Sequence, residues 1–189
     1  AADDFADEGD RTSDERLRLL DGWRCRLRSA ASGEAAPTPP VFGEPAHTPE
    51  IFIALAATMR EKRLGVESFE DLLSAFAQDV TVKRYEGWAD LLDYCRRSAN
   101  PVGRLVLRVS GHRSNRLDAL SDAVCTALQL TNFWQDLKPD FERGRIYLPA
   151  EELRAHGAAE ADFARSRSTV SLADALRAAV SRTRGPVGA

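Results

Sequence analysis

The sequence has 189 residues, of which 43% are apolar and 29% are charged, a composition that fits one globular domain with a substantial core. Its net charge of −3 argues against nucleic acid as a main partner, because proteins with that role usually carry a basic balance or a basic stripe. No apolar run approaches the roughly 18 residues that a membrane-spanning helix needs. No signal-peptide pattern is visible.

Helical periodicity dominates the sequence and strand patterns are almost absent, which predicts an all-α protein. Residues 1–8 are interpreted as the end of a helix, and the capping box of Thr12 and Glu15 predicts a second helix that runs to about Ser29. Five prolines mark residues 30–49 as a loop. Further helices are predicted over residues 50–63, 67–78, 86–109, 115–138, 150–156, 159–166 and 171–183.

The two longest predicted helices, 86–109 and 115–138, are largely apolar and would be central to a bundle. Pro101 is expected to kink the first of them, and Pro139 to end the second. In a bundle of this kind, a functional site lies in the core between facing helices.

Three cysteines, Cys25, Cys95 and Cys125, are too few and too scattered for a disulfide framework or a zinc site. All three fall in helical patterns, so we expect buried thiols in a reducing compartment, which favours a cytoplasmic protein. The three histidines lack ligand spacing.

Acidic residues are paired at a spacing of four, which puts two carboxylates on one helix face. The spacing alone is weak evidence, since an exposed acidic face explains it equally well. Two of the pairs have a suggestive context, because one lies in a cluster with Asp4 and Glu8 and the other is followed by Arg143 and Arg145. Pairs with this spacing are Asp3/Asp7, Asp10/Asp14, Asp118/Asp122 and Asp136/Asp140.

Two facing carboxylate clusters would suit Mg²⁺, a hard ion that takes oxygen ligands, keeps several waters and is usually completed by substrate phosphates. Asn132 and Gln129 lie one and two helical turns before Asp136 on roughly the same face. Arginines beside such a site add bidentate contacts to phosphate. Together these residues predict a diphosphate clamp, and the apolar helices would hold a carbon skeleton and keep water from a carbocation.

Three segments, "DDFADE", "YCRRSANPVGRLVL" and "ALQLTNFWQDLKPDFERGRIYLP", resemble the squalene/phytoene synthase family. The resemblance extends from Ala1 to about Asp162 and rests mainly on the third segment. It implies the isoprenoid synthase fold, a helical bundle around a central cavity, here as a single incomplete domain over residues 1–189. "SANPVG" and "NFWQD" further resemble the hydroxysqualene synthase branch of the family.

The resemblance also implies site residues. Tyr94 matches a catalytic tyrosine near the reacting carbons, and the metal ligands would be Asp3, Asp7, Asp136 and Asp140, assisted by Asn132. Ala99 and Gly103 would keep the "SANPVG" helix thin beside a prenyl chain. The remaining residues on the substrate side are Asp4 within the first motif, Gln129 on the wall of the second, and Arg145 and Tyr147 around the diphosphate.

Arg84 and Tyr85, with Asp79 upstream, are candidates for the mouth of the site, with Arg84 as a substrate-binding residue. A solvated loop explains these residues equally well, so both interpretations stay open. Arg96 and Arg97 are expected on the outer face.

The implied activity is Mg²⁺-dependent conversion of presqualene diphosphate to hydroxysqualene with loss of diphosphate, in squalene supply for hopanoids. An alternative within the family is a squalene or phytoene synthase that acts on two prenyl diphosphates. The substrate is therefore expected to be presqualene diphosphate or farnesyl diphosphate. One alternative outside catalysis is an assembly helper, since some family members resemble the fold without being enzymes. The other is an inactive fragment, because family members carry further helices before "DDFADE" and after about residue 185, and we expect a chain shortened at both ends. A long-chain lipid product is compatible with peripheral membrane contact, and the residues indicate no particular oligomeric state.

Overall fold

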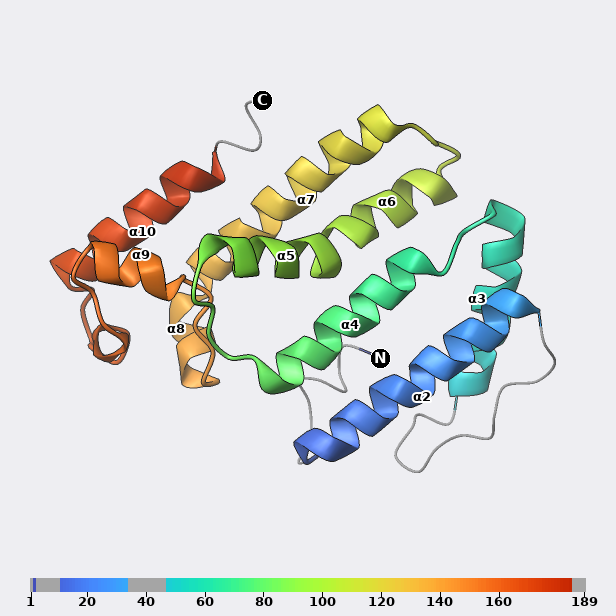
Figure 1. Cartoon of the computed structure of the whole chain (residues 1–189), viewed down its shortest axis with the longest axis horizontal. Coiled ribbons are helices and arrows are strands. Elements are labelled where there is room, and N and C mark those ends of the chain that lie inside the picture. The colour runs from blue at the N-terminus through green and yellow to red at the C-terminus, as the bar shows by residue number, and fades with distance from the viewer. Residues whose placement is uncertain (1, 3–10, 34–46, 185–189) are drawn as a thin grey trace. The chain divides into compact units, whose positions relative to one another are not determined.

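The computed structural model describes residue 2, residues 11–33 and residues 47–184 (Figure 1). The described residues form helices joined by turns, with one isolated bridge between Arg84 and Ile146 and no strand. The prediction of an all-α protein is therefore confirmed. The first aspartate motif, with Asp3, Asp4 and Asp7, lies outside the described residues, as does most of the proline-rich segment.

Contacts divide the chain into two compact units, each of which is described by itself. The first unit comprises Ala1–Thr81 and Pro101–Asp118, and the second comprises Val82–Asn100 and Ala119–Ala189. The single isoprenoid synthase domain expected from the sequence stays a prediction.

The first unit is built on α2 (Ser13–Ser32), which contacts both α3 (Thr48–Lys62) and α4 (Glu67–Thr81). Helices α2 and α4 lie side by side and run in opposite directions (Figure 1). The predicted capping box starts α2: the Glu15 amide donates to the Thr12 hydroxyl at 3.3 Å, and the Thr12 amide donates to the Glu15 carboxylate at 2.8 Å. The loop predicted over residues 30–49 is too long at both ends, because α2 continues to Ser32 and α3 starts at Thr48.

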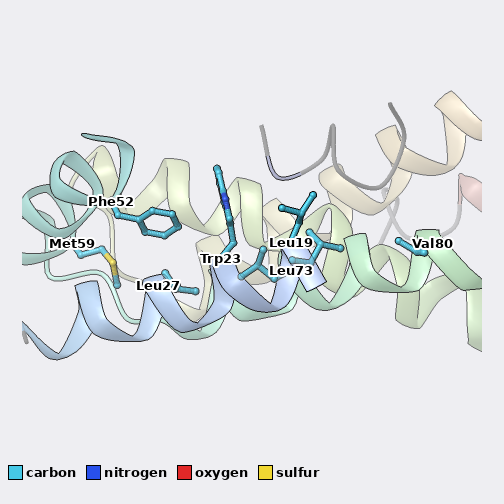
Figure 2. Close-up of a cluster of buried hydrophobic side chains, with 8 residues drawn as sticks. Leu19, Trp23, Leu27, Phe52, Met59, Leu73 and Val80 are labelled. Atoms are coloured by element: carbon cyan, nitrogen blue, oxygen red, sulfur yellow. The ribbon is translucent and has the colours of Figure 1, made fainter. Parts of the chain in front are cut away.

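The core of the first unit is a cluster of buried apolar side chains from these three helices (Figure 2). Trp23 of α2 packs edge-on against Phe52 of α3, with ring centroids 5.1 Å apart. Beside them lies an apolar cavity of about 170 Å³, and Ala2, which directly precedes Asp3 in the sequence, lines it together with Phe69 and Phe76. The buried members of the cluster are Leu19, Leu20, Trp23, Leu27, Phe52, Met59, Leu73 and Val80.

The predicted helix 86–109 is divided into α5 (Trp88–Ser98) and α6 (Asn100–Val109). Pro101 has no N–H to donate to the carbonyl four residues earlier, and the helix is interrupted at Ala99. The helix is therefore interrupted two residues before Pro101, and the kink itself stays a prediction. The Asn100 side chain is nearly buried and accepts a hydrogen bond from the Thr126 hydroxyl at 2.9 Å.

The predicted helix 115–138 is divided as well, into α7 (Asn115–Gln135) and α8 (Leu137–Glu142). The chain continues through α9 (Ala150–Ala155), the short 3₁₀ helix η1 (Glu160–Asp162) and α10 (Val170–Thr183). Of the elements predicted after residue 115, only the helix over residues 159–166 is wrong in type, because a single 3₁₀ turn replaces it.

A buried carboxylate, Glu152, joins three helices of the second unit. Its side chain is 4% exposed, and it accepts a hydrogen bond from the Trp88 indole at 2.7 Å and pairs with Arg182 at 3.1 Å. The Arg182 guanidinium also lies 5.6 Å from the centroid of the Trp88 ring. A buried carboxylate needs such partners, so this network ties α9 to α5 and α10.

The cysteines differ from the expectation at one position. Cys95 is buried, and burial raises the pKa of its thiol to about 12, so it is inert at physiological pH. Cys125 is partly buried, but Cys25 is exposed, because it lies on the outer face of α2.

Among residues 2, 11–33 and 47–184, no helix combines the length and the apolar character needed to cross a membrane.

Candidate functional site

The second acidic motif lies where α7 passes into α8. The backbone hydrogen bonds continue through this point, since the Asp136 amide donates to the Asn132 carbonyl and the Asp140 amide donates to the Asp136 carbonyl, both at 2.9 Å. Asn132, Asp136 and Asp140 therefore follow one another at one-turn intervals along one side of the chain. The structure brings these three predicted metal-binding residues together.

The helix is interrupted at Asp136 rather than at Pro139, where the sequence predicts its end. Pro139 has no N–H to donate to the Gln135 carbonyl, so the interruption falls one turn before the proline. Pro139 itself lies within the first turn of α8, a position that tolerates proline.

Two of these side chains are available to a ligand. Asn132 and Asp136 are exposed, and within the described part of the chain neither side chain makes a hydrogen bond or an ion pair. Asp140 is more enclosed, with a side chain that is 15% exposed and an oxygen 4.0 Å from the Arg143 guanidinium.

Oxygen donors of this kind fit Mg²⁺, which prefers carboxylate and amide oxygens and keeps several waters. Among the residues that the structure describes, no group of three or more acidic, histidine or cysteine side chains is arranged to hold a metal. The second motif thus offers two carboxylates and one amide. Further ligands would have to come from residues outside this motif, a substrate or water.

A row of exposed apolar side chains along α7 leads to the acidic line of Asn132, Asp136 and Asp140. Leu120, Val124 and Leu128 are 55%, 50% and 59% exposed. They occupy the same i, i+4 row that continues with Asn132 and Asp136. This ridge therefore changes from apolar to polar and acidic toward the C-terminal end of α7, while it winds around the helix by about 40° at each step.

The buried aromatic cluster of Tyr85, Tyr94, Phe133 and Tyr147 lies in the same unit. Phe133 and Tyr147 are stacked at 3.8 Å with an angle of 5° between the rings. The Tyr94 ring is 6.1 Å from Tyr147 and 5.6 Å from Tyr85. The predicted catalytic residue Tyr94 is therefore next to the predicted substrate residue Tyr147, and Tyr85, expected at the mouth of the site, is buried.

The turn after α8 connects the acidic line to the segment with Arg145 and Tyr147. The Arg145 amide donates to the Asp140 carbonyl at 2.8 Å and the Gly144 amide donates to the Phe141 carbonyl at 2.9 Å, the two bonds of a Schellman motif. Gly144 has φ +78°, the left-handed region that favours glycine. Asp140 and Arg145 are thus held together through the backbone.

Replacing Gly144 with Ala is expected to lower the free energy of unfolding by about 1–2 kcal/mol, because an L-residue is strained at this φ. A Cβ at this position meets no atom within 4 Å, so the cost is conformational and not a clash. Asn tolerates the left-handed region, so Gly144→Asn should be milder. Urea unfolding followed by circular dichroism measures both, and an equal loss in the two variants would contradict the explanation.

The Arg84 guanidinium is hydrogen-bonded to other groups of the protein. Its guanidinium donates to both carboxylate oxygens of Glu160, at 2.8 and 3.0 Å, and to the Gly144 carbonyl at 2.6 Å. The hydrogen bond from Arg84 holds the pKa of the Glu160 carboxyl below its usual range.

The other residues considered from the sequence lie on or next to α5, α6 and α7. Gln129 is partly buried on α7, one turn before Phe133, and Ala99 is buried just after α5, where its amide donates to the Cys95 carbonyl at 2.9 Å. Gly103 is partly buried on α6 and belongs to the first unit. Arg96 and Arg97 both bond to Asp93; Arg96 is exposed as expected, whereas the Arg97 side chain is only 14% exposed and departs from that expectation.

A groove of about 670 Å³ lies between α7 and α10. Its walls are Thr131, Trp134 and Gln135 from α7 and mainly Leu176 and Val180 from α10. With about 3.6 residues per turn, Thr131 and Trp134 lie on another face of the helix from Asn132 and Asp136. None of the residues that line this groove is a predicted site residue.

Sequence reasoning missed the acidic partner of Arg84 and the carboxylate Glu152. Glu160 is 76 residues from Arg84 in the chain, and no local pattern pairs them. Glu152 lies in a polar stretch, "AEELRA", whose charged residues suggest an exposed helix.

Comparisons with known proteins agree on one family. The sequence profile described as squalene/phytoene synthase matches residues 1–187. A hydroxysqualene synthase of Zymomonas mobilis is 37% identical over 97% of the chain, and a 15-cis-phytoene synthase of Synechococcus elongatus is 30% identical over 82% of it. The chain spans 57% and 51% of the length of these two relatives.

A solved structure is also similar. The squalene synthase HpnC from Alicyclobacillus acidocaldarius matches 98% of the chain with a TM-score of 0.84 and 37% identity, and the chain covers 65% of that structure. The isoprenoid synthase fold predicted from the sequence is thereby confirmed.

Proposed function

Because the chain belongs to the squalene/phytoene synthase family, we propose that it forms the catalytic part of a Mg²⁺-dependent hydroxysqualene synthase. The reaction would convert presqualene diphosphate and water to hydroxysqualene, diphosphate and a proton. The observation that carries the proposal is the row along α7, in which exposed Leu120, Val124 and Leu128 lead to Asn132 and Asp136. A ligand with a long apolar chain and a charged head matches this order of side chains.

Charge complementarity supports the assignment of the head group. Mg²⁺, when held by Asn132, Asp136 and Asp140, would supply positive charge that stabilises the departing diphosphate. Arg145 follows Asp140 in the same turn and can donate to phosphate oxygens through a planar fork. Because Asn132 and Asp136 have no partner in the described part of the chain, binding need not break an existing contact.

The apolar surroundings would protect the reacting carbon. When the C–O bond to diphosphate breaks, its electron pair leaves with the diphosphate and a cyclopropylcarbinyl cation remains, which rearranges. The faces of aromatic rings such as Tyr94 stabilise a cation, and the buried aromatic cluster excludes bulk water. Addition of one water molecule and loss of a proton would then give the alcohol.

A second candidate is the synthesis of squalene or phytoene from two prenyl diphosphates. The 30% identity to a 15-cis-phytoene synthase of Synechococcus elongatus favours keeping it. Product analysis by mass spectrometry separates the two: presqualene diphosphate should yield hydroxysqualene, whereas farnesyl or geranylgeranyl diphosphate alone should yield no hydrocarbon.

Thermal melting tests the diphosphate clamp directly. We expect the melting midpoint to rise only when Mg²⁺ and inorganic pyrophosphate are both present, since a ligand at a hundred times its dissociation constant adds about 2.7 kcal/mol of stability. Far-UV circular dichroism measures the midpoint. Mg²⁺ alone, pyrophosphate alone and an Asp136→Asn variant are the controls, and a cooperative melt that no combination shifts would contradict the clamp and favour a non-catalytic helper.

A further inference from the structure

Four of the five N–H groups of the Arg84 guanidinium are used within the protein. Two reach the Glu160 carboxylate, and two reach the carbonyls of Lys83 at 2.8 Å and Gly144 at 2.6 Å. A guanidinium that is occupied in this way has little capacity left for a phosphate group. Its bonds instead connect η1, the strand-like segment before α5 and the turn after α8.

The segment that Arg84 holds carries several proposed site residues. Gly144 is the left-handed residue of the Schellman motif, in which the Asp140 carbonyl accepts the Arg145 amide. One residue further on, the Ile146 amide donates to the Lys83 carbonyl at 3.0 Å. The backbone from Asp140 to Tyr147 is therefore anchored to residues 83–84 at two successive points.

We propose that Arg84 is a positioning residue, which together with Glu160 holds the Gly144 turn so that Asp140, Arg145 and Tyr147 are correctly placed for a diphosphate. This inference rests on the proposed function of these three residues. It assigns Arg84 a different role from the substrate contact and the solvated loop that the sequence left open, and it assigns Glu160 a role in the same site.

The two roles of Arg84 make opposite predictions for Glu160. If Arg84 bound diphosphate directly, removing the Glu160 charge would release the guanidinium and leave diphosphate affinity unchanged or higher. If Arg84 positions the turn, loss of either partner loosens the same segment and lowers the affinity. The pair is largely exposed, at 39% for Arg84 and 56% for Glu160, so it adds little to global stability and its removal should not unfold the protein.

The experiment compares Arg84→Lys, Glu160→Gln and the double variant in the intact chain. Titration calorimetry with Mg²⁺ and inorganic pyrophosphate should show an affinity about tenfold lower for each single variant, because small displacements of charged groups are costly. The double variant should bind pyrophosphate no more weakly than the weaker-binding single variant, since both substitutions disrupt the same Arg84–Glu160 interaction. Asp174→Asn, which breaks the exposed pair of Asp174 and Arg177 on α10, is the matched control and should change nothing.

Hydrogen exchange provides a readout that needs no ligand. The amides of Arg145 and Ile146 are hydrogen-bonded, so their exchange should speed up in Arg84→Lys and in Glu160→Gln but not in Asp174→Asn. Unchanged exchange in both variants would overturn the positioning role, as would pyrophosphate affinity that falls in Arg84→Lys alone. If pyrophosphate fails to bind even to the unmodified chain, the proposed function fails, and accelerated exchange would still establish that Arg84 and Glu160 hold the turn.

Discussion

Replacing Asp136 with Asn is expected to lower kcat/KM for presqualene diphosphate about 1,000-fold, which corresponds to roughly 4 kcal/mol of transition-state stabilisation. The Asp136 side chain is exposed and, in the described part of the chain, has no hydrogen bond or ion pair to lose. Its removal should therefore cost a metal ligand and leave the fold intact. Turnover is measured by release of diphosphate, and folding by far-UV circular dichroism.

Asp14→Asn is the matched control for this variant. Asp14 is also an exposed aspartate with a partner four residues away in the sequence, Asp10, but it belongs to the first turn of α2. Its replacement should leave turnover unchanged. Normal turnover by Asp136→Asn would contradict the metal-binding role, whereas equal losses in the two variants would show a general dependence on surface charge.

The replacement of Phe133 with Ala is expected to lower the free energy of unfolding by about 3–5 kcal/mol. Phe133 is 5% exposed and is stacked on Tyr147 at 3.8 Å, so the change leaves a cavity in the centre of the aromatic cluster. For a chain of this size, the melting midpoint should fall by roughly 6–20 °C. Calorimetry or a circular dichroism melt gives the value.

Leu92→Ala provides the comparison, because Leu92 belongs to the same unit and its side chain is 40% exposed. Its replacement should cost much less, since little apolar surface returns to water. Phe133→Leu should fall between the two. A loss in Phe133→Ala no larger than that in Leu92→Ala would mean that the stacked rings do not stabilise the unit.

Local signals made the helices predictable. The capping box of Thr12 and Glu15 placed the start of α2, and Pro101 placed the break between α5 and α6, because both act through hydrogen bonds within a few residues. The sequence predicts the end of a helix at Pro139 itself. The interruption lies at Asp136 because the missing N–H leaves a carbonyl without a donor one turn earlier.

The candidate site was predictable where its residues share one helix or one motif. Asn132, Asp136 and Asp140 follow helical periodicity, and the structure arranges them accordingly. The pairing of Arg84 with Glu160 and the buried position of Glu152 depend on tertiary contacts between residues far apart in the sequence. Composition and periodicity carry no information about such contacts, and a charged residue is ordinarily assigned to the surface.

The contacts of α10 have a consequence for spectroscopy. Of the three tryptophans, Trp23 packs against Phe52 in the first unit, whereas Trp88 lies beside Arg182 and the Trp134 indole donates to the Thr183 hydroxyl at 2.9 Å. Both Arg182 and Thr183 belong to the last turn of α10. Detachment of this helix would expose two indoles to water and shift their fluorescence to longer wavelength, while Trp23 would keep its emission. The chain therefore carries separate intrinsic fluorophores for its two units, and Trp→Phe variants would let the opening of each be followed on its own.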